Sequence, residues 1–155
     1  MLTAEYAKAF TVTKVEREAV FPYKDVWRRV NLPVLTAVAR ESLFLLVHNK
    51  YPVKERLFRV GLAVDPYCEV CPGGSICDVE HFFCSCSTVT LVWRWVRGRV
   101  VEMLGAGGAQ VSNWEIINLV LPTSTFDKEI VWLVGSYVTR VWEEIFVRGG
   151  GYAEG

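Results

Sequence analysis

Apolar residues recur every three or four positions over most of this chain, which is the spacing of one face of an α-helix. The clearest stretch predicts a helix that opens with Pro33 at its first position and stops near Asn49, before Pro52. Almost no segment alternates apolar and polar residues as a half-buried strand would. We therefore expect a mainly α-helical fold. The apolar stripe of this first helix is Leu35, Val38, Ala39, Leu43 and Leu46, with Ser42 in the same row.

Helical spacing also predicts further helices on both sides of this one. A short helix is expected at 25–31, another between Pro52 and Gly61, and longer ones from Thr88 to Leu104 and over 127–147. Asn113 is expected to cap a short helix at 114–121, since its side chain can accept a hydrogen bond from a free backbone N–H. The buried face predicted after Thr88 consists of Val92, Trp95, Val96, Val100, Met103 and Leu104.

A cluster of cysteines interrupts the helical pattern. Cys68 and Cys71 form a Cys-x2-Cys turn, His81 follows after nine residues, and Cys86 after four more. Three thiolates and one imidazole complete a tetrahedral zinc site and leave no position open for water, as in metal sites that hold a fold together. The sequence therefore predicts Zn²⁺ bound in a small Cys3His knuckle between helices.

Spacing alone does not decide which cysteine is the fourth ligand. If residues 79–85 form a helical turn, Cys84 lies three positions after His81 on the same face and replaces Cys86 as the fourth ligand. Cys77 is expected to be a bystander or a thiol near the site. Disulfides are a weaker alternative, because the chain has five cysteines, an odd number, and its first residues lack the apolar core of a secretory signal. A reducing, intracellular location, cytoplasmic or nuclear, is expected.

Composition and charge narrow the classes of function. The chain is 52% hydrophobic with six tryptophans, which predicts a sizeable core or a buried partner face. Its formal net charge is zero, whereas an isolated nucleic-acid binder is usually basic. The longest apolar stretch, 130–139, is far shorter than the roughly 20 residues that cross a bilayer, so no membrane association is expected.

Two stretches resemble the zinc-binding domain found C-terminal to the reverse transcriptase of LINE-type (non-LTR) retrotransposons. The segment 43–57 carries His48-Asn49 and then Pro52 in the register of that family. In the metal stretch, Asp78 before His81 and Trp93 after Cys86 fall into the family pattern. The resemblance covers roughly residues 27–95.

This resemblance implies a module that helps to hold RNA template or target DNA while a polymerase domain, attached or separate, copies it. The sequence has no Asp-Asp pair for a polymerase site and nothing like an endonuclease, so we expect a fragment without catalytic activity. Arg94 and Arg97 are expected to be exposed together, and Trp93 is the best candidate to stack on a base. The candidate phosphate contacts are Lys50, Lys54, Arg56, Arg59, Arg94 and Arg97.

An architectural role is the competing hypothesis. Zinc would then hold together a helical bundle whose wide apolar faces pack on a polymerase or another protein. The expected organisation is the same in both cases. Residues 1–22 form a lead-in or a remnant of an upstream region, 23–105 a helical zinc-binding domain, 106–148 C-terminal helices that pack on it, and 149–155 a glycine-rich tail.

Overall fold

The computed structural model of the chain describes residues 22–148. Nearly all of the predicted lead-in at 1–22, and the glycine-rich tail at 149–155, lie outside the described residues. Between residues 22 and 148 the chain forms helices and no strand, with one isolated antiparallel bridge between Tyr67 and Ile76. The prediction of a mainly α-helical fold is confirmed. None of the helices in this range is long and apolar enough to cross a membrane.

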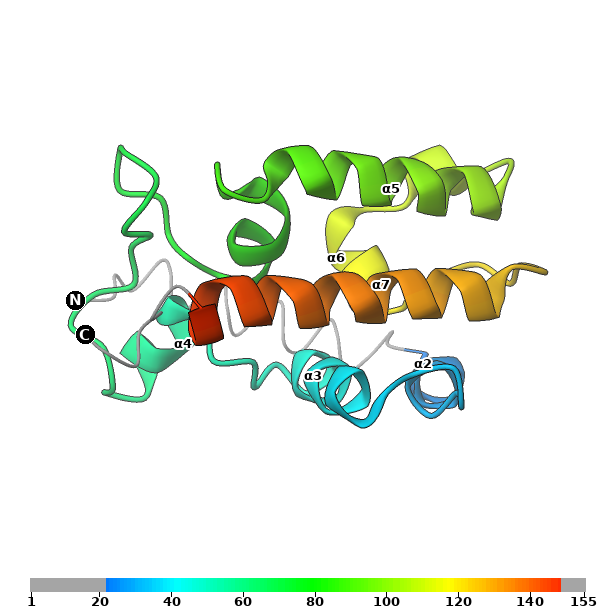
Figure 1. Ribbon diagram of the computed structural model, residues 1–155, viewed down its shortest axis with the longest axis horizontal. Helices are drawn as coiled ribbons and strands as arrows, with labels where there is room; N and C mark the ends of the chain where they lie inside the picture. Colours follow the sequence, from blue (N-terminus) through cyan, green and yellow to red (C-terminus); the bar gives the residue numbers. More distant parts are fainter. Residues whose placement is uncertain (1–21, 149–155) are drawn as a thin grey trace.

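The helices form layers around the last long helix, α7 (Asp127–Trp142), which continues as a π-helical segment over Glu143–Arg148. In Figure 1, α5 (Thr90–Leu104) lies on one side of α7, and α2 (Tyr23–Val30) and α3 (Ala37–Val47) lie on the other. α7 contacts all three of these helices. Its broad apolar face is therefore buried on two sides, and the buried residues are Ile130, Val131, Val134, Gly135, Tyr137, Val138 and Val141.

Gly135 sets how closely α3 and α7 approach. A Cβ atom at this position would lie 2.5 Å from Cδ2 of Leu35 and 3.4 Å from Cβ of Ala39. Because glycine has no Cβ, the two helices pack with their backbones close together. The face that the sequence predicted for α3 is the one that meets α7 here.

The start of α3 differs from the prediction. The helix begins at Ala37, with Thr36 as its N-cap, and Pro33 lies in the preceding turn. The Thr36 hydroxyl accepts a hydrogen bond of 3.1 Å from the Ala39 N–H, and so satisfies one of the free backbone donors at the start of the helix. The side chain of Pro33 has no atom that could accept this bond. At the other end Asn49 adopts a left-handed φ of 57°, a conformation that asparagine tolerates, and this stops the helix where expected.

The helix after the cluster buries Val96 and Val100 as predicted, but not Val92 and Trp95. Trp93, Val96 and Val100 of α5 are buried, whereas Val92 is 56% and Trp95 61% exposed. The inner face of the helix is thus centred on Trp93. The position of Trp93 is fixed by a hydrogen bond that its indole N–H donates to Asn113.

Two short helices complete the fold. Helix α4 (Lys54–Arg59) lies between Pro52 and Gly61 as predicted. Helix α6 (Asn113–Ile117) has Ser112 rather than Asn113 as its N-cap, in a reciprocal capping box with Glu115, and it ends well before residue 121. A 3-10 turn at Gly108–Gln110 precedes it. The domain boundaries expected at residues 105 and 148 stay predictions.

Candidate metal centre

A small hairpin carries the first two cysteines. The Cys68 N–H donates to the Ser75 carbonyl and the Cys77 N–H to the Pro66 carbonyl, both at 2.8 Å. Between these bonds the chain reverses at Gly73 and Gly74, whose φ values of 88° and 72° suit glycine. The Cys-x2-Cys turn therefore lies at the tip of a closed loop, with both sulfurs near each other.

A π turn over His81–Ser85 carries the other two candidate ligands. It closes with a hydrogen bond of 2.7 Å from the Cys86 N–H to the His81 carbonyl, five residues back. In an α-helix, residues five apart point about 140° away from each other. The wider π turn brings His81 and Cys86 back to the same side of the backbone.

The inner side of the π turn is anchored by aromatic packing. Phe82 and Phe83 are buried, and their rings lie 6.1 and 5.1 Å from the ring of Tyr51 between centroids. Trp142, at the end of α7, packs on the same tyrosine at 5.7 Å. With these rings in the core, His81 and Cys86 lie on the other side of the turn, against the hairpin that carries Cys68 and Cys71.

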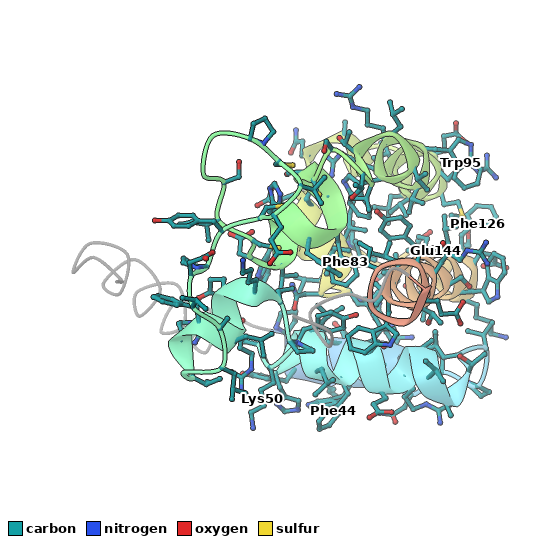
Figure 2. The ribbon with its side chains drawn as sticks, turned by 60° about the vertical axis from the view of Figure 1, so that its left-hand side comes forward. Phe44, Lys50, Phe83, Trp95, Phe126 and Glu144 are labelled. Carbon is teal, nitrogen blue, oxygen red and sulfur yellow. The ribbon has the colours of Figure 1, made fainter. Side chains whose placement is uncertain are left out.

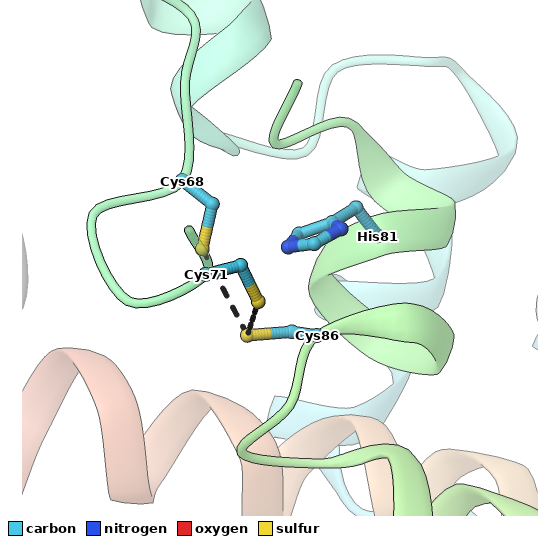
Figure 3. Close-up of side chains that lie close together, drawn as sticks. All are labelled: Cys68, Cys71, His81 and Cys86. Atoms are coloured by element: carbon cyan, nitrogen blue, oxygen red, sulfur yellow. Dashed lines mark hydrogen bonds between the residues drawn. The ribbon is translucent and has the colours of Figure 1, made fainter. Parts of the chain in front are cut away.

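Four side chains meet at one point as a result. The ligand atoms of Cys68, Cys71, His81 and Cys86 all lie within 4.8 Å of one another. The Cys86 sulfur is 3.9 Å from the Cys68 sulfur and 3.8 Å from the Cys71 sulfur (Figure 3). Two thiolates bound to one zinc ion at about 2.3 Å in a tetrahedron are about 3.8 Å apart. The spacing of the sulfurs is thus the spacing that zinc requires.

The imidazole supplies a second test of the fit. Nε2 of His81 is buried and has no hydrogen-bond partner among the described residues. A buried polar atom without a partner is costly. Figure 3 shows the imidazole turned toward the three sulfurs, so a metal ion bound there would satisfy it. The backbone N–H of His81 donates to Asp78 Oδ1 at 2.8 Å, which fixes the start of the turn.

The thiols differ in their readiness to ionise. Cys71 has its pKa lowered to about 6, chiefly by the Ser87 hydroxyl at 3.4 Å and the Ser87 N–H at 3.3 Å. Burial raises the pKa of Cys86, partly offset by the hydroxyl of Thr88. Because the thiolate is the form that binds metal, Cys71 is better prepared to bind it than Cys86.

The remaining cysteines lie elsewhere. Cys84 and Cys77 are buried in the core at 3% and 2% exposure, and burial strongly raises the pKa of Cys84. Cys84 follows Phe83 on the inner side of the π turn and is not part of the cluster, whereas Cys86 is. All five cysteines are free thiols in this structure.

A family model described as zinc-binding in reverse transcriptase matches residues 5–93. The chain belongs to this family. Neither a curated protein nor a solved structure matches it. Membership of a zinc-binding family and the Cys3His geometry agree, and the prediction of zinc as the cofactor is confirmed. The match ends at Trp93, so most of α5 and all of α6 and α7 lie beyond it.

Three of the six predicted phosphate contacts are occupied within the fold. Lys54 is nearly buried and pairs with Asp65 at 3.0 Å and Glu69 at 3.2 Å. Arg59 pairs with Glu55 on the same helix. Lys54 thus connects α4 to the loop that leads into the knuckle, and Arg59 forms an ion pair within α4 itself.

Arg97 is the third occupied cation. Its guanidinium donates to Asn113 Oδ1 at 3.0 Å and to the Val111 carbonyl at 2.5 Å. The prediction that Arg94 and Arg97 are exposed together is therefore wrong for Arg97. Within residues 22–148, Lys50, Arg56 and Arg94 make no ion pair, and Lys50 and Arg94 are exposed.

Trp93 cannot stack on a base in this fold. It is 2% exposed, its indole N–H donates to Asn113 Oδ1 at 3.1 Å, and its ring packs on Tyr137 at 5.4 Å between centroids. The exposed tryptophans are Trp95 at 61% and Trp132 at 52%. Helical spacing had placed Trp95 on the buried face of its helix.

Proposed function

We propose that this chain is the non-catalytic zinc module of a LINE-type reverse-transcriptase protein, placed C-terminal to the polymerase, and that it assists binding of RNA template or target DNA. The observation that carries the proposal is the Cys3His cluster in a chain of the family described as zinc-binding in reverse transcriptase. A reverse transcriptase must hold nucleic acid. A metal-braced domain attached to it is well suited to that task.

Near the cluster, exposed positive charge supports this role only on the side of α5. Arg94 lines a groove of about 620 Å³ between the π turn, α5 and the start of α6. Its other polar lining residues include Ser85, Thr90, Ser112, Arg97 and one carboxylate, Glu80. The groove runs from the residue beside Cys86 to an exposed guanidinium. Hydroxyls and a cation in that arrangement match the oxygens of a phosphate backbone.

A salt titration tests the proposal directly. The zinc-loaded chain is titrated against a fluorescein-labelled single-stranded RNA by anisotropy. With about three phosphate contacts, the affinity should fall about 20-fold between roughly 50 and 200 mM salt, because bound counterions are released. Arg94→Glu should weaken binding further. Lys24→Glu, at an exposed position of α2 on the far side of α7, is the matched control and should have little effect.

A structural role is the second candidate. The pairing of Lys54, Arg59 and Arg97 inside the fold favours it, since it removes half of the predicted phosphate contacts. Zero formal net charge points the same way. Under this candidate the chain packs on a polymerase domain and retains no nucleic acid even at low salt, whereas a purified polymerase domain pulls it down.

A further inference from the structure

We propose that the outer face of α5 is a platform for single-stranded nucleic acid, on which Trp95 stacks against an unpaired base while Arg94 and Arg99 contact the phosphates beside it. This inference rests on the proposed function and assigns it to a surface. None of the three residues belongs to the metal cluster, and all lie beyond the part of the chain that the family model matches.

An open apolar strip runs along the solvent side of α5. Leu91 is 74% and Trp95 61% exposed, although both are large hydrophobic residues. Gly98 follows Trp95 by three positions, and a Cβ built there would meet nothing within 4 Å. The three residues are neighbours on one helix face. Trp95 therefore stands beside a gap in the side-chain layer into which a flat ring fits.

Figure 2 places Trp95 at the outer edge of α5. Its neighbour Trp93 points the opposite way, into the core against Tyr137. Trp93 already supplies the tryptophan that packs in the core, so core packing does not explain a second tryptophan two positions later. Exposing so much aromatic surface is unfavourable unless something covers it.

Cations flank the strip on both sides. At about 100° per residue, Arg94 and Arg99 project on opposite sides of the line through Leu91, Trp95 and Gly98. No hydrogen bond or ion pair within the described residues engages Arg94. Arg99 bonds to Glu102 at 2.7 Å, but both side chains are at least half exposed, and such surface pairs contribute little, so a phosphate can replace Glu102.

The aromatic and cationic side chains of the strip indicate which class of ligand it binds. A base can stack on Trp95 only if it is unpaired, because the bases of a duplex already stack on one another. Alternating aromatic and cationic side chains are the usual means by which proteins bind single strands without sequence preference. The groove lined by Arg94, Ser85 and Thr90 lies on the same helix and gives the strand a path toward the zinc knuckle.

Trp132 provides the matched control. Its exposed fraction, 52%, is similar to that of Trp95, but it lies on α7 and lines a different groove with Arg140 and Glu143. Trp95→Ala and Trp132→Ala each remove one exposed tryptophan without opening the core. Both should keep the wild-type melting temperature and one bound zinc per chain.

The experiment compares zinc-loaded wild type, Trp95→Ala, Trp132→Ala and Arg94→Glu on single-stranded oligo-uridine and on an RNA duplex of equal length. Stacking on one base should make Trp95→Ala bind the single strand roughly 5- to 150-fold more weakly. Trp132→Ala should match wild type. Oligo-uridine should quench the tryptophan fluorescence of wild type and of Trp132→Ala, and quench Trp95→Ala less. The wild type should prefer the single strand to the duplex.

Three results would overturn the platform. If nucleic acid binds with steep salt dependence but Trp95→Ala binds as well as wild type, the inference fails and the proposed function stands. If Trp95→Ala releases a polymerase domain while nucleic-acid affinity is unchanged, the strip is a protein-docking face. If no nucleic acid binds at low salt, both the inference and the nucleic-acid role are wrong.

Discussion

The hydroxyl of Tyr137 donates a 2.5 Å hydrogen bond to the backbone carbonyl of Phe83, inside the π turn that carries His81 and Cys86. The group is buried, and burial raises the pKa of Tyr137, so it is a neutral donor at any physiological pH. Tyr137 belongs to α7, outside the segment that the family model matches. Helix α7 thus supports the π turn of the metal site through this hydrogen bond.

Tyr137→Phe should weaken zinc binding as well as stability. The change removes only the donor and leaves the Phe83 carbonyl buried without a partner, at a cost of about 1–3 kcal/mol. Part of that cost should appear as lower zinc affinity, because the turn that aligns His81 and Cys86 is loosened. Competition with a chromogenic chelator measures the affinity, and thermal unfolding of the zinc-free protein separates the loss of stability.

Tyr67→Phe is the control for that variant. Tyr67 lies in the hairpin next to Cys68 but is 46% exposed, so its hydroxyl has water available. Its zinc affinity should equal that of wild type. Equal affinities for Tyr137→Phe and Tyr67→Phe would show that α7 does not support the site.

Cys84 and Cys86 provide a test of the π turn. Cys86→Ser should lose tight zinc binding, because one of the three thiolates is removed. Cys84→Ala should keep one zinc per chain and lose about 1 kcal/mol of stability from a small cavity. Cobalt substitution makes the difference visible, since the intensity of the sulfur-to-cobalt charge-transfer band follows the number of thiolates. The opposite pattern would place Cys84 in the coordination sphere.

The sequence predicted the components of this site better than their surroundings. Ligand spacing identifies Cys68, Cys71 and His81, because a Cys-x2-Cys turn and a nearby His have few other uses. Spacing also favoured Cys86 as the fourth ligand, and the π turn explains why Cys84, the alternative, lies outside the cluster. No sequence pattern indicates that turn, because it depends on Phe82 and Phe83 packing against Tyr51.

Long-range polar contacts explain the other errors. On the inner face of α5, Trp93 takes the place predicted for Val92 and Trp95, since the Trp93 indole finds its acceptor on Asn113, twenty positions away in sequence. Lys54 is an ordinary exposed lysine by sequence, but Asp65 and Glu69 of the following loop enclose it. Helical periodicity carries no information on such partners.

Removing the metal should loosen the knuckle first. Zinc binding contributes about 10–16 kcal/mol in small zinc fingers, whereas here the α3–α7 interface is independent of the cluster, so only part of that energy supports the whole fold. Chelation should speed amide exchange over residues 66–86 far more than in α3 and α7. An equal increase in amide exchange across the whole fold after chelation, or no change at 66–86, would contradict a local structural metal. Acidification should act in the same direction, because protons compete for the thiolates and the imidazole.

A buried arginine joins α2 to the loop before α7. Arg29 is 1% exposed, and its guanidinium donates to Asp127 at 3.2 Å and to the carbonyls of Leu119 and Leu121 at 2.8 and 3.0 Å. These bonds satisfy two loop carbonyls that lack strand or helix partners. Arg28 reaches the same carboxylate at 3.1 Å, but its side chain is 51% exposed.

Arg29→Ala should therefore destabilise the fold by about 3 kcal/mol or more, because a largely buried carboxylate and two carbonyls lose their donor. Arg28→Ala, which removes the exposed partner of the same Asp127, should cost less than about 1 kcal/mol. Urea unfolding of both variants, zinc-loaded and at constant pH, measures the difference. Neither change touches the cluster, so both proteins should still bind one zinc. Equal losses for the two arginines would mean that burial of Arg29 adds nothing to the stability of the α2–α7 junction.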